Sequence, residues 1–413
     1  MESSRRFQVK ELEQASLDQE APVERPTTPG PGRPRLCVLS PWAPPEESCL
    51  EDYLRLVLVG LSRWAEVDLV LTAVGGNAPT FEQARVIGLV SQRSGPRAVR
   101  AVLDHLARLA PQLVLIQYFP FQWSSRGLDI TVPLLTAALR LRGLAFDVVF
   151  HELWVPLELV PHRLLRGLMQ RAVATWILAL ARRVVVSSFE RVHEISRCLP
   201  WCGSKVRMLP IPSLVPDGEL DPNERERLRA ELGVGRDEVL LGVLGFDHDS
   251  KPVQGLWRVR ELLEESGIRS RLLVIGKTRL EASPAMPPEA RRWPIHAGYC
   301  PGARVSALLG TLDVFLAPMI DGISSRRSST AAALAHGVPV VTTSGHHTDP
   351  ALFDQSSMRL APAGDEEAFA MAVLEVAASS PLRLTLGRAG QELYRRHLGW
   401  PRQWEAMAEV HRP

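Results

Sequence analysis

Short apolar runs alternate with longer helical segments along the first half of the chain. The runs are rich in β-branched residues and lie at 36–39, 67–73, 113–117, 147–151 and 184–187. Residues 50–64, between the first two runs, carry apolar side chains at helical spacing. This alternation predicts an α/β architecture, in which helices flank a parallel β-sheet.

The second half repeats the pattern after an interruption. Pro210, Pro212 and Pro216 precede a charged helical segment at 223–232, which indicates a linker. Further apolar runs lie at 239–244, 272–275, 314–317 and 338–342, and two helices at 382–411 separate near Gly399 and Pro401. The predicted organisation is a flexible tail at 1–34, Rossmann-like domains at 35–212 and 213–395, and a helix at 396–413 that crosses back to the N-terminal domain.

Composition narrows the class of protein. The chain has 413 residues, more than one hydrophobic core normally fills. Its 48 Lys and Arg against 46 Asp and Glu leave a formal charge of +2, which does not indicate nucleic acid as a partner. Five scattered cysteines predict reduced thiols and a cytoplasmic protein. Cys198 and Cys202 lack a second ligand pair, so ordinary thiols are preferred to a zinc site.

Targeting and membrane signals are weak. No apolar run follows the charged N-terminus, and the longest run, 172–181, is shorter than the ~20 residues that a membrane span needs. The segment 159–183 mixes Arg166, Arg171 and Arg182 with large apolar residues. Two interpretations stay open: a core helix with a solvated basic face, which we prefer, or a segment lying on the inner face of an anionic membrane.

The richest chemistry follows the run 314–317, at the segment 321–330 (DGISSRRSST). In open α/β sheets ligands bind beyond the carboxyl ends of the strands, and free amides at the start of the following alanine-rich helix suit an anion. The side chains that supply hydroxyls and positive charge there are Ser328, Ser329, Thr330, Arg326 and Arg327. The segment therefore predicts a phosphate site, with a capped surface helix as the alternative.

The stretch 308–343 (LLGTLDVFLAPMIDGISSRRSSTAAALAHGVPVVTT) resembles the donor-binding signature of retaining GT-B glycosyltransferases of the glycogen-synthase-like group. Shorter matches follow one another along the chain: VLSPW, FHELW, VVVSSF, MLPIPS, LLGVLGF, LLVIGK and HAGY. The resemblance implies two Rossmann-like domains whose parallel sheets face a deep cleft, with a nucleotide-sugar donor on the C-terminal domain and the acceptor on the other. It also implies retention of anomeric configuration, with no cofactor and no metal.

The resemblance assigns roles to single residues. It implies that the turn at Arg327, Ser328 and Ser329 holds the donor diphosphate, and that His151 is a cleft histidine near the transferring sugar. The alternative for His151 is a strand-end histidine bonded to backbone. Asp321 is expected beside the sugar as the second catalytic residue, and Lys251 on a phosphate. The residues expected to line the donor cleft are Glu152, Gly245, Gly322 and Ser324.

Three departures from the family pattern stand out. The family's two glutamates, eight positions apart, correspond to Ser324 and Ala332. Its arginine after the first donor-domain strand corresponds to Phe246, and residues 43–48 (APPEES) stand where it has a Gly-rich loop. Asp321 is the candidate to replace the first glutamate, and Arg326 or Arg327 the missing arginine.

The predicted function is a transferase that moves a sugar from a nucleoside diphosphate sugar to an acceptor hydroxyl in carbohydrate biosynthesis. The acceptor, a glycan, lipid or small molecule, stays open. The alternative is a catalytically weak nucleotide-sugar-binding protein of the same fold. A dehydrogenase is disfavoured because no Gly-x-Gly-x-x-Gly follows the first strand. A cluster of four aromatic residues either stacks on the acceptor or packs under a loop: Tyr118, Phe119, Phe121 and Trp123.

Overall fold

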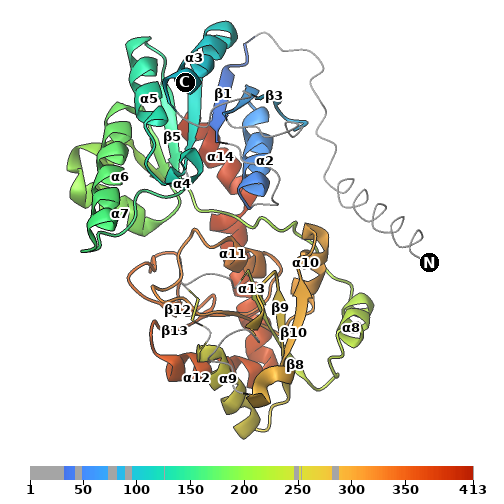
Figure 1. Ribbon diagram of the computed structural model, residues 1–413. Coiled ribbons are helices and arrows are strands. Elements are labelled where there is room, and N and C mark those ends of the chain that lie inside the picture. The colour runs from blue at the N-terminus through green and yellow to red at the C-terminus, as the bar shows by residue number, and fades with distance from the viewer. Residues whose placement is uncertain are drawn as a thin grey trace. The chain divides into compact units, whose positions relative to one another are not determined.

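The apolar runs form two parallel β-sheets, one from each half of the chain, in the computed structural model (Figure 1). It describes residues 32–41, 49–72, 81–88, 95–124, 126–245, 251–252, 254–280 and 288–412. Most of the predicted tail, Trp42, residues 43–48 and Phe246 lie outside this set.

The chain divides into two compact units. The N-terminal unit comprises Pro31–Pro212, Ser324–Arg326 and Leu398–Pro413, and the C-terminal unit comprises Ser213–Ile323 and Arg327–His397. The short segment Ser324–Arg326 therefore groups with the N-terminal unit, although the residues on both sides of it belong to the C-terminal unit.

The sheet of the N-terminal unit has seven parallel strands in the order β3-β2-β1-β4-β5-β6-β7. Its strands are β1 (Arg35–Ser40), β2 (Glu66–Leu71), β3 (Arg85–Gly88), β4 (Leu113–Tyr118), β5 (Phe146–Phe150), β6 (Val184–Val186) and β7 (Val206–Met208). Chain order reverses between β1 and β4, which is the point where doubly wound sheets bind ligands.

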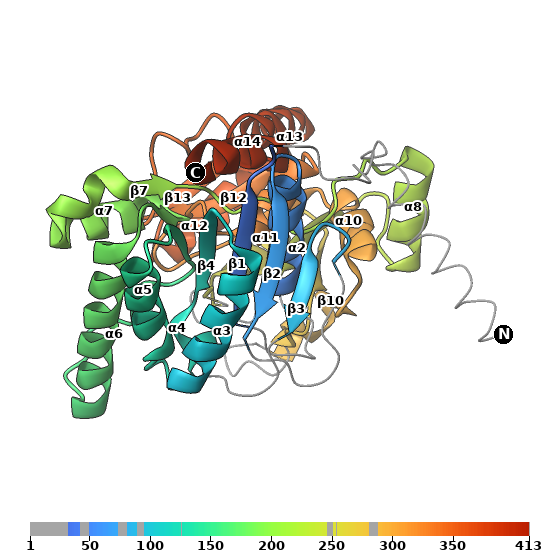
Figure 2. The same cartoon turned by 90° about the horizontal axis from the view of Figure 1, so that it is seen from above.

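Helices cover both faces of this sheet. They are α2 (Cys49–Ser62), α3 (Pro96–Leu109), α4 (Pro120–Trp123), α5 (Thr131–Leu141), α6 (Pro161–Leu180), α7 (Phe189–Cys198), the 3₁₀ helix η1 (Pro200–Lys205) and α14 (Trp400–His411). Helices α3, α5 and α6 lie on one face, and α2 with α14 lies on the other (Figure 2). Helix α3 buries Val99, Val102 and Leu106, a spacing of three and four that places one stripe against the sheet.

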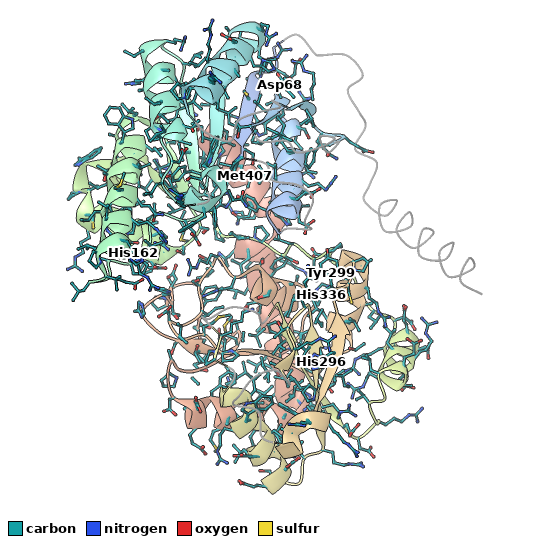
Figure 3. All side chains as sticks on the ribbon, in the orientation of Figure 1. Asp68, His162, His296, Tyr299, His336 and Met407 are labelled. Carbon is teal, nitrogen blue, oxygen red and sulfur yellow. The ribbon has the colours of Figure 1, made fainter. Side chains whose placement is uncertain are left out.

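A buried ionic group anchors α14 to β5. Asp147 accepts hydrogen bonds from Arg182 Nε at 2.9 Å and from His411 Nδ1 at 2.8 Å. Burial would raise the pKa of Asp147, but the hydrogen bonds from Arg182 and His411 outweigh it and hold that pKa below its usual value. Met407, on the same helix, is also buried (Figure 3).

The sheet of the C-terminal unit has six parallel strands in the order β10-β9-β8-β11-β12-β13. They are β8 (Val239–Leu244), β9 (Ser270–Ile275), β10 (Pro294–Gly298), β11 (Val314–Ala317), β12 (Val340–Ser344) and β13 (Arg359–Pro362). Its helices are α8 (Pro222–Glu231), α9 (Gln254–Glu265), η3 (Pro288–Arg292), α10 (Gly302–Gly310), α11 (Ser328–Ala335), α12 (Glu366–Ala378), α13 (Ser380–Leu393) and the π-helix η4 (Tyr394–Leu398).

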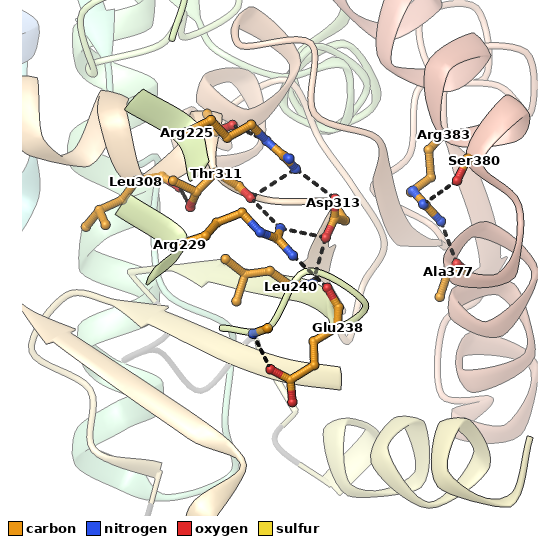
Figure 4. Close-up of polar contacts among 12 residues, drawn as sticks. Arg225, Arg229, Glu238, Leu240, Leu308, Thr311, Asp313, Ala377, Ser380 and Arg383 are labelled. Carbon is orange, nitrogen blue, oxygen red and sulfur yellow. Dashed lines mark hydrogen bonds and ion pairs between the residues drawn. The ribbon is translucent and has the colours of Figure 1, made fainter. Parts of the chain in front are cut away.

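The charged helix α8 attaches to this sheet through an ion-pair network (Figure 4). Asp313, just before β11, accepts from Arg225 Nη2 and from Arg229 Nη1, each at 2.8 Å. The backbone amide of Leu240 adds a third bond of 2.8 Å to Asp313. Burial opposes ionisation, but the Leu240 amide and Arg229 hold the pKa of Asp313 below its usual value. A helix with few apolar side chains is thereby fixed to the core.

The predicted α/β alternation is confirmed. Four strands were not predicted by the apolar pattern: β3, β7, β10 and β13. In the described part of the chain no single helix is both long and apolar enough to cross a membrane. One bent pair, Glu366–Ala378 with Ser380–His411, meets the length and composition criteria at a bend of 105°.

Candidate functional site

The carboxyl edge of the C-terminal sheet brings together loops from three neighbouring strands. Gly245 follows β8, residues 318–327 follow β11, and residues 345–348 follow β12. The loop after β11 is bonded to β12 and to the loop that follows it, since Ile323 N donates to Thr343 O at 2.8 Å and His347 N donates to Asp321 O at 3.0 Å. Because parallel strands end at one edge, residues far apart in sequence meet there.

Gly322 and Gly345 let these two loops pack backbone against backbone. Gly322 has φ 86°, and a Cβ there would overlap Gly345 N. A Cβ on Gly345 would lie 2.5 Å from Asp321 O. Glycine is therefore required at position 322 by both conformation and space, which explains the predicted site glycine in terms of packing.

The start of α11 presents backbone amides without a side-chain cap. Arg327 is the N-cap residue, and its carbonyl accepts from Thr330 N and Ala331 N. The amides of Ser328 and Ser329 precede the first intrahelical donors, and both residues are half-buried. Thr330 is buried, and its Oγ1 has no hydrogen-bond partner among the residues described. Ser328 and Ser329 are therefore the donors available to an anion.

Two cations gather beside this helix start. Lys251 is buried, and its Nζ donates to Leu244 O at 3.0 Å and to Gly245 O at 2.6 Å. Burial and the charge of Arg327 lower the pKa of Lys251 to about 8. Like charges held together at a helix N-terminus favour a bound anion.

The segment Ser324–Arg326 is held by the N-terminal unit. Ser325 Oγ donates to Ser187 O at 2.8 Å, and Ile211 N donates to Ser325 O at 2.9 Å. Ser324 is buried, and across the described chain its Oγ meets no hydrogen-bond partner, whereas Arg326 is half-buried. Arg326 and Arg327, adjacent in sequence, thus belong to different units.

His151 lies at the end of β5 in the N-terminal unit. Its Nε2 is 2.8 Å from Gln117 Oε1, an atom that only accepts, so Nε2 carries the proton and Nδ1 is left as an acceptor. Tyr53 packs edge-on against the imidazole at 5.2 Å. Burial lowers the pKa of His151 to about 4, so the ring is neutral near pH 7. Glu152, next in the chain, is half-buried.

The aromatic cluster after β4 divides into two pairs. Tyr118 and Trp123 are fully buried, and Trp123 Nε1 donates to Gln117 O at 2.9 Å. Phe119 and Phe121 are half-buried. Packing therefore accounts for Tyr118 and Trp123, and an acceptor contact stays a prediction for the two phenylalanines only.

Sequence reasoning missed three polar residues at these positions. Gln117 is the partner of His151, and His346 and His347 flank the carboxylate of Asp321 at 3.6 Å and 3.7 Å. The signal for the histidines was their place directly after β12, in the sequence SGHHTD, at the ligand-binding edge of the sheet. The roles assigned to the predicted site residues stay predictions.

Two doubly wound parallel sheets of this kind define a GT-B fold, and the comparisons confirm that fold class. Sucrose-phosphate synthase from Thermosynechococcus elongatus is 18% identical with a TM-score of 0.69, covering 92% of this chain and 98% of its own. The glycosyltransferase WaaG is 16% identical with a TM-score of 0.65, covering 92% and 100%. HepE from Anabaena, solved with UDP, is 13% identical with a TM-score of 0.63, covering 91% and 99%.

Sequence comparison finds a family match in the C-terminal unit. Residues 239–379 match the model of the family described as glycosyl transferases group 1. This segment carries Gly245, Lys251 and the whole 321–330 stretch, so the resemblance to group 1 glycosyltransferases is confirmed for the part of the chain that holds the candidate phosphate site, and retention of configuration stays a prediction. The prediction of a transferase enzyme is confirmed with it. No curated protein sequence matches the chain.

Proposed function

We propose that this enzyme transfers a sugar from a nucleoside diphosphate sugar to an acceptor hydroxyl with retention of anomeric configuration. The observation that carries the proposal is the pair Lys251 and Arg327 beside the uncapped start of α11. A diphosphate neutralises two like charges and accepts from the amides of Ser328 and Ser329. HepE, of the same fold, has been solved with UDP and with UDP-glucose, which supports a nucleotide-sugar donor.

The reaction places new negative charge where these groups lie. As the sugar leaves, charge concentrates on the β-phosphate, so amides and cations fixed there stabilise the transition state more than the ground state. Thr330 adds a third hydroxyl to this turn, and Arg326 adds charge from the adjoining segment. In the C-terminal unit, Asp321 bonds hydroxyls of the donor sugar, and the roles of His151 and Glu152 in the N-terminal unit stay predictions.

A second candidate function is nucleotide-sugar binding with little turnover. The family's two glutamate positions are held here by Ser324 and Ala332, and both residues are buried. The contact of the second glutamate has no substitute among the predicted residues. Binding of a nucleotide sugar without its consumption would identify this function.

The direct test is calorimetric titration of the full chain with UDP, GDP, ADP and TDP. We expect micromolar binding of one of them, weakened tenfold or more, about 1.4 kcal/mol, by Lys251→Ala and by Ser328→Pro. Proline at the first helical position keeps the helix and removes one amide donor, and Arg327 before it, with φ -93° and ψ 83°, already lies outside the helical region that a following proline disfavours. Arg236→Ala, at an exposed position in the same unit, is the control.

The outcomes separate the two functions. Unchanged affinity in both variants, or no nucleotide bound, would overturn the donor site. If a nucleotide binds, its glucose, galactose and mannose conjugates are offered without acceptor, and NMR identifies the anomer of the sugar first released. Release of the inverted anomer contradicts retention, and binding without release points to the second candidate.

We also propose that α6 and the turn before it contact the inner face of an anionic membrane. The preferred sequence interpretation is a core helix with a basic outer face. The outer face of α6 also carries large apolar side chains. The large apolar side chains exposed there are Leu157, Leu159, Val160, Leu165, Leu168, Met169 and Trp176. Leu159 is 96% exposed, the exposed His162 lies on α6 (Figure 3), and Arg166 is half-buried between Leu165 and Leu168 in the sequence. Apolar side chains interleaved with cations suit an anionic lipid surface.

Vesicle sedimentation tests this contact. We expect the protein to bind phosphatidylglycerol vesicles better than phosphatidylcholine vesicles, and Leu165→Glu with Leu168→Glu to reduce binding at least fivefold. Leu384→Glu, at a similarly exposed leucine in the C-terminal unit, is the matched control. Equal binding by the control and the double variant would contradict the assignment to α6.

A further inference from the structure

One group of potential metal ligands lies outside the predicted phosphate contacts. Asp321, His346 and His347 each offer a ligand atom, and these atoms all lie within 4.8 Å of one another. His346 Nε2 is 3.6 Å from Asp321 Oδ1, and His347 Nδ1 is 3.7 Å from Asp321 Oδ2. The carboxylate thus lies against both imidazoles, one on each oxygen.

The fold holds these three residues in place. Asp321 follows β11 and the histidines follow β12, and these strands pair with Ala317 opposite Thr342. The bond from His347 N to Asp321 O ties the two loops at the ligands themselves. Thr348 closes the second loop, because its Oγ1 accepts from Gly345 N at 3.0 Å and its amide donates to Gly345 O at 3.0 Å. Preorganised ligands of this kind need little rearrangement to bind an ion.

We propose that Asp321, His346 and His347 bind a divalent transition-metal ion of the zinc class. Ligand atoms about 2.0–2.2 Å from a tetrahedral ion lie roughly 3.3–3.6 Å from one another. The two rings face different oxygens of Asp321, and the three ligand atoms lie within 4.8 Å of one another, so the side chains move inward to reach this spacing. Two imidazoles and one carboxylate favour Zn²⁺, Co²⁺ or Ni²⁺ over Mg²⁺ and Ca²⁺, which prefer all-oxygen ligands.

The three side chains differ in a way that suits capture of an ion. Asp321 and His347 are half-buried, whereas the side chain of His346 is 71% exposed. The ion therefore reaches the ligands from the solvent side, at the exposed ring of His346. Three protein ligands leave a fourth position for water or another small ligand. An ion here would join the loops after β11 and β12, and this proposal does not depend on glycosyl transfer.

The test uses metal and protein alone. The full chain, stripped with a chelator and dialysed, is titrated with Zn²⁺ by calorimetry and with Co²⁺ by visible absorption. We expect one ion per chain, a Co²⁺ spectrum of nitrogen and oxygen ligands without thiolate bands, and a higher thermal midpoint with Zn²⁺. His346→Gln, His347→Gln and Asp321→Asn should each weaken binding at least tenfold.

Controls separate this site from other ligands. His162→Gln removes an exposed histidine of the other unit and should leave the affinity unchanged. His346→Gln alters a largely exposed side chain, so it tests the site even if the Asp321 variant fails to fold. Wild-type affinity in both histidine variants, or thiolate bands from bound Co²⁺, would overturn the proposal. Nucleotide is absent throughout, so failure of the donor site would leave this result intact.

Discussion

His411 Nδ1 lies 2.8 Å from Asp147 Oδ2, although 264 residues separate them in the chain. Both side chains are buried, and Arg182 completes the group by bonding the same carboxylate at 2.8 Å. Helix α14 thus ends on the sheet of the N-terminal unit through ionic hydrogen bonds in addition to apolar contacts.

Asp147→Ala should strongly destabilise the N-terminal unit. Removing one member of a buried ionic group leaves its partners without an acceptor, at a cost of about 3–5 kcal/mol. The free energy of urea unfolding measures this, with Glu409→Ala on the exposed side of α14 as a control expected within about 0.5 kcal/mol of wild type. Similar losses in the two variants would mean that the group contributes little.

Low pH should reduce the stability that the Asp147 group contributes. The pKa of Asp147 is lower in the folded protein than in the unfolded chain, so its contribution is fully present above the unfolded value and is lost as pH falls through the folded one. We expect the stability difference between wild type and Asp147→Asn to shrink as the pH is lowered below about 4. Urea unfolding at a series of pH values from 3 to 7 checks this, and a difference independent of pH would contradict it.

Nucleotide affinity should fall in alkali through Lys251. Its pKa of about 8 means that the free protein loses this positive charge as pH rises above 8, while a bound diphosphate favours the charged form. Affinity should then decrease by up to about tenfold per pH unit, the slope of one linked proton. Calorimetry from pH 6.5 to 9.5 measures it. Lys251→Arg, which stays charged throughout, should flatten the curve; an equal decline in that variant would assign it to another group.

His151 should make stability rise between pH 4 and 6.5. The folded protein holds this ring neutral down to about pH 4, whereas the unfolded chain binds a proton below about 6.5, so more protons are bound in the unfolded state across this window. His151→Gln removes the effect and keeps an amide that can face Gln117. Its unfolding free energy should therefore rise less between pH 4.5 and 6.5, and a slope equal to wild type would contradict the lowered pKa.

Much of the fold could be predicted because the central strands are buried on both faces. Runs such as 113–116 and 239–244 are apolar throughout, which is typical of a parallel sheet between helices. The strands that were missed are short and near the sheet edges. β13 (RLAP) and β10 (PIHAG) have few apolar residues, since an edge position buries less of each side chain.

The site could be predicted only where it is local in sequence. Arg327, Ser328 and Ser329 are consecutive, so a helix start and its anion-binding amides were readable from the chain. Gln117 meets His151 only because β4 pairs with β5, and His347 meets Asp321 only because β11 pairs with β12. Strand order and register set these contacts, and the apolar pattern carries no information about either.

The turn at Gly322 should tolerate no side chain, because of both its left-handed backbone conformation and its lack of space. Gly364 is a matched glycine that separates these two reasons. Gly322 and Gly364 have φ values of 86° and 84°, but a Cβ on Gly364 meets nothing within 4 Å, whereas one on Gly322 overlaps Gly345 N. Gly364→Ala should therefore lose only the roughly 1–2 kcal/mol of left-handed backbone strain. Gly322→Ala should lose a further ~1–3 kcal/mol from overpacking.

Urea unfolding of the two variants measures the difference, and amide exchange locates it. Ile323 N donates to β12 and His347 N donates to the loop that holds Gly322, so their exchange should quicken in Gly322→Ala and stay slow in Gly364→Ala. Equal losses of stability with slow exchange in both would show that the loops separate enough to admit a methyl group. In that case the backbone contact between Gly322 and Gly345 does not set the spacing between Asp321 and the two histidines. The side chains themselves set it.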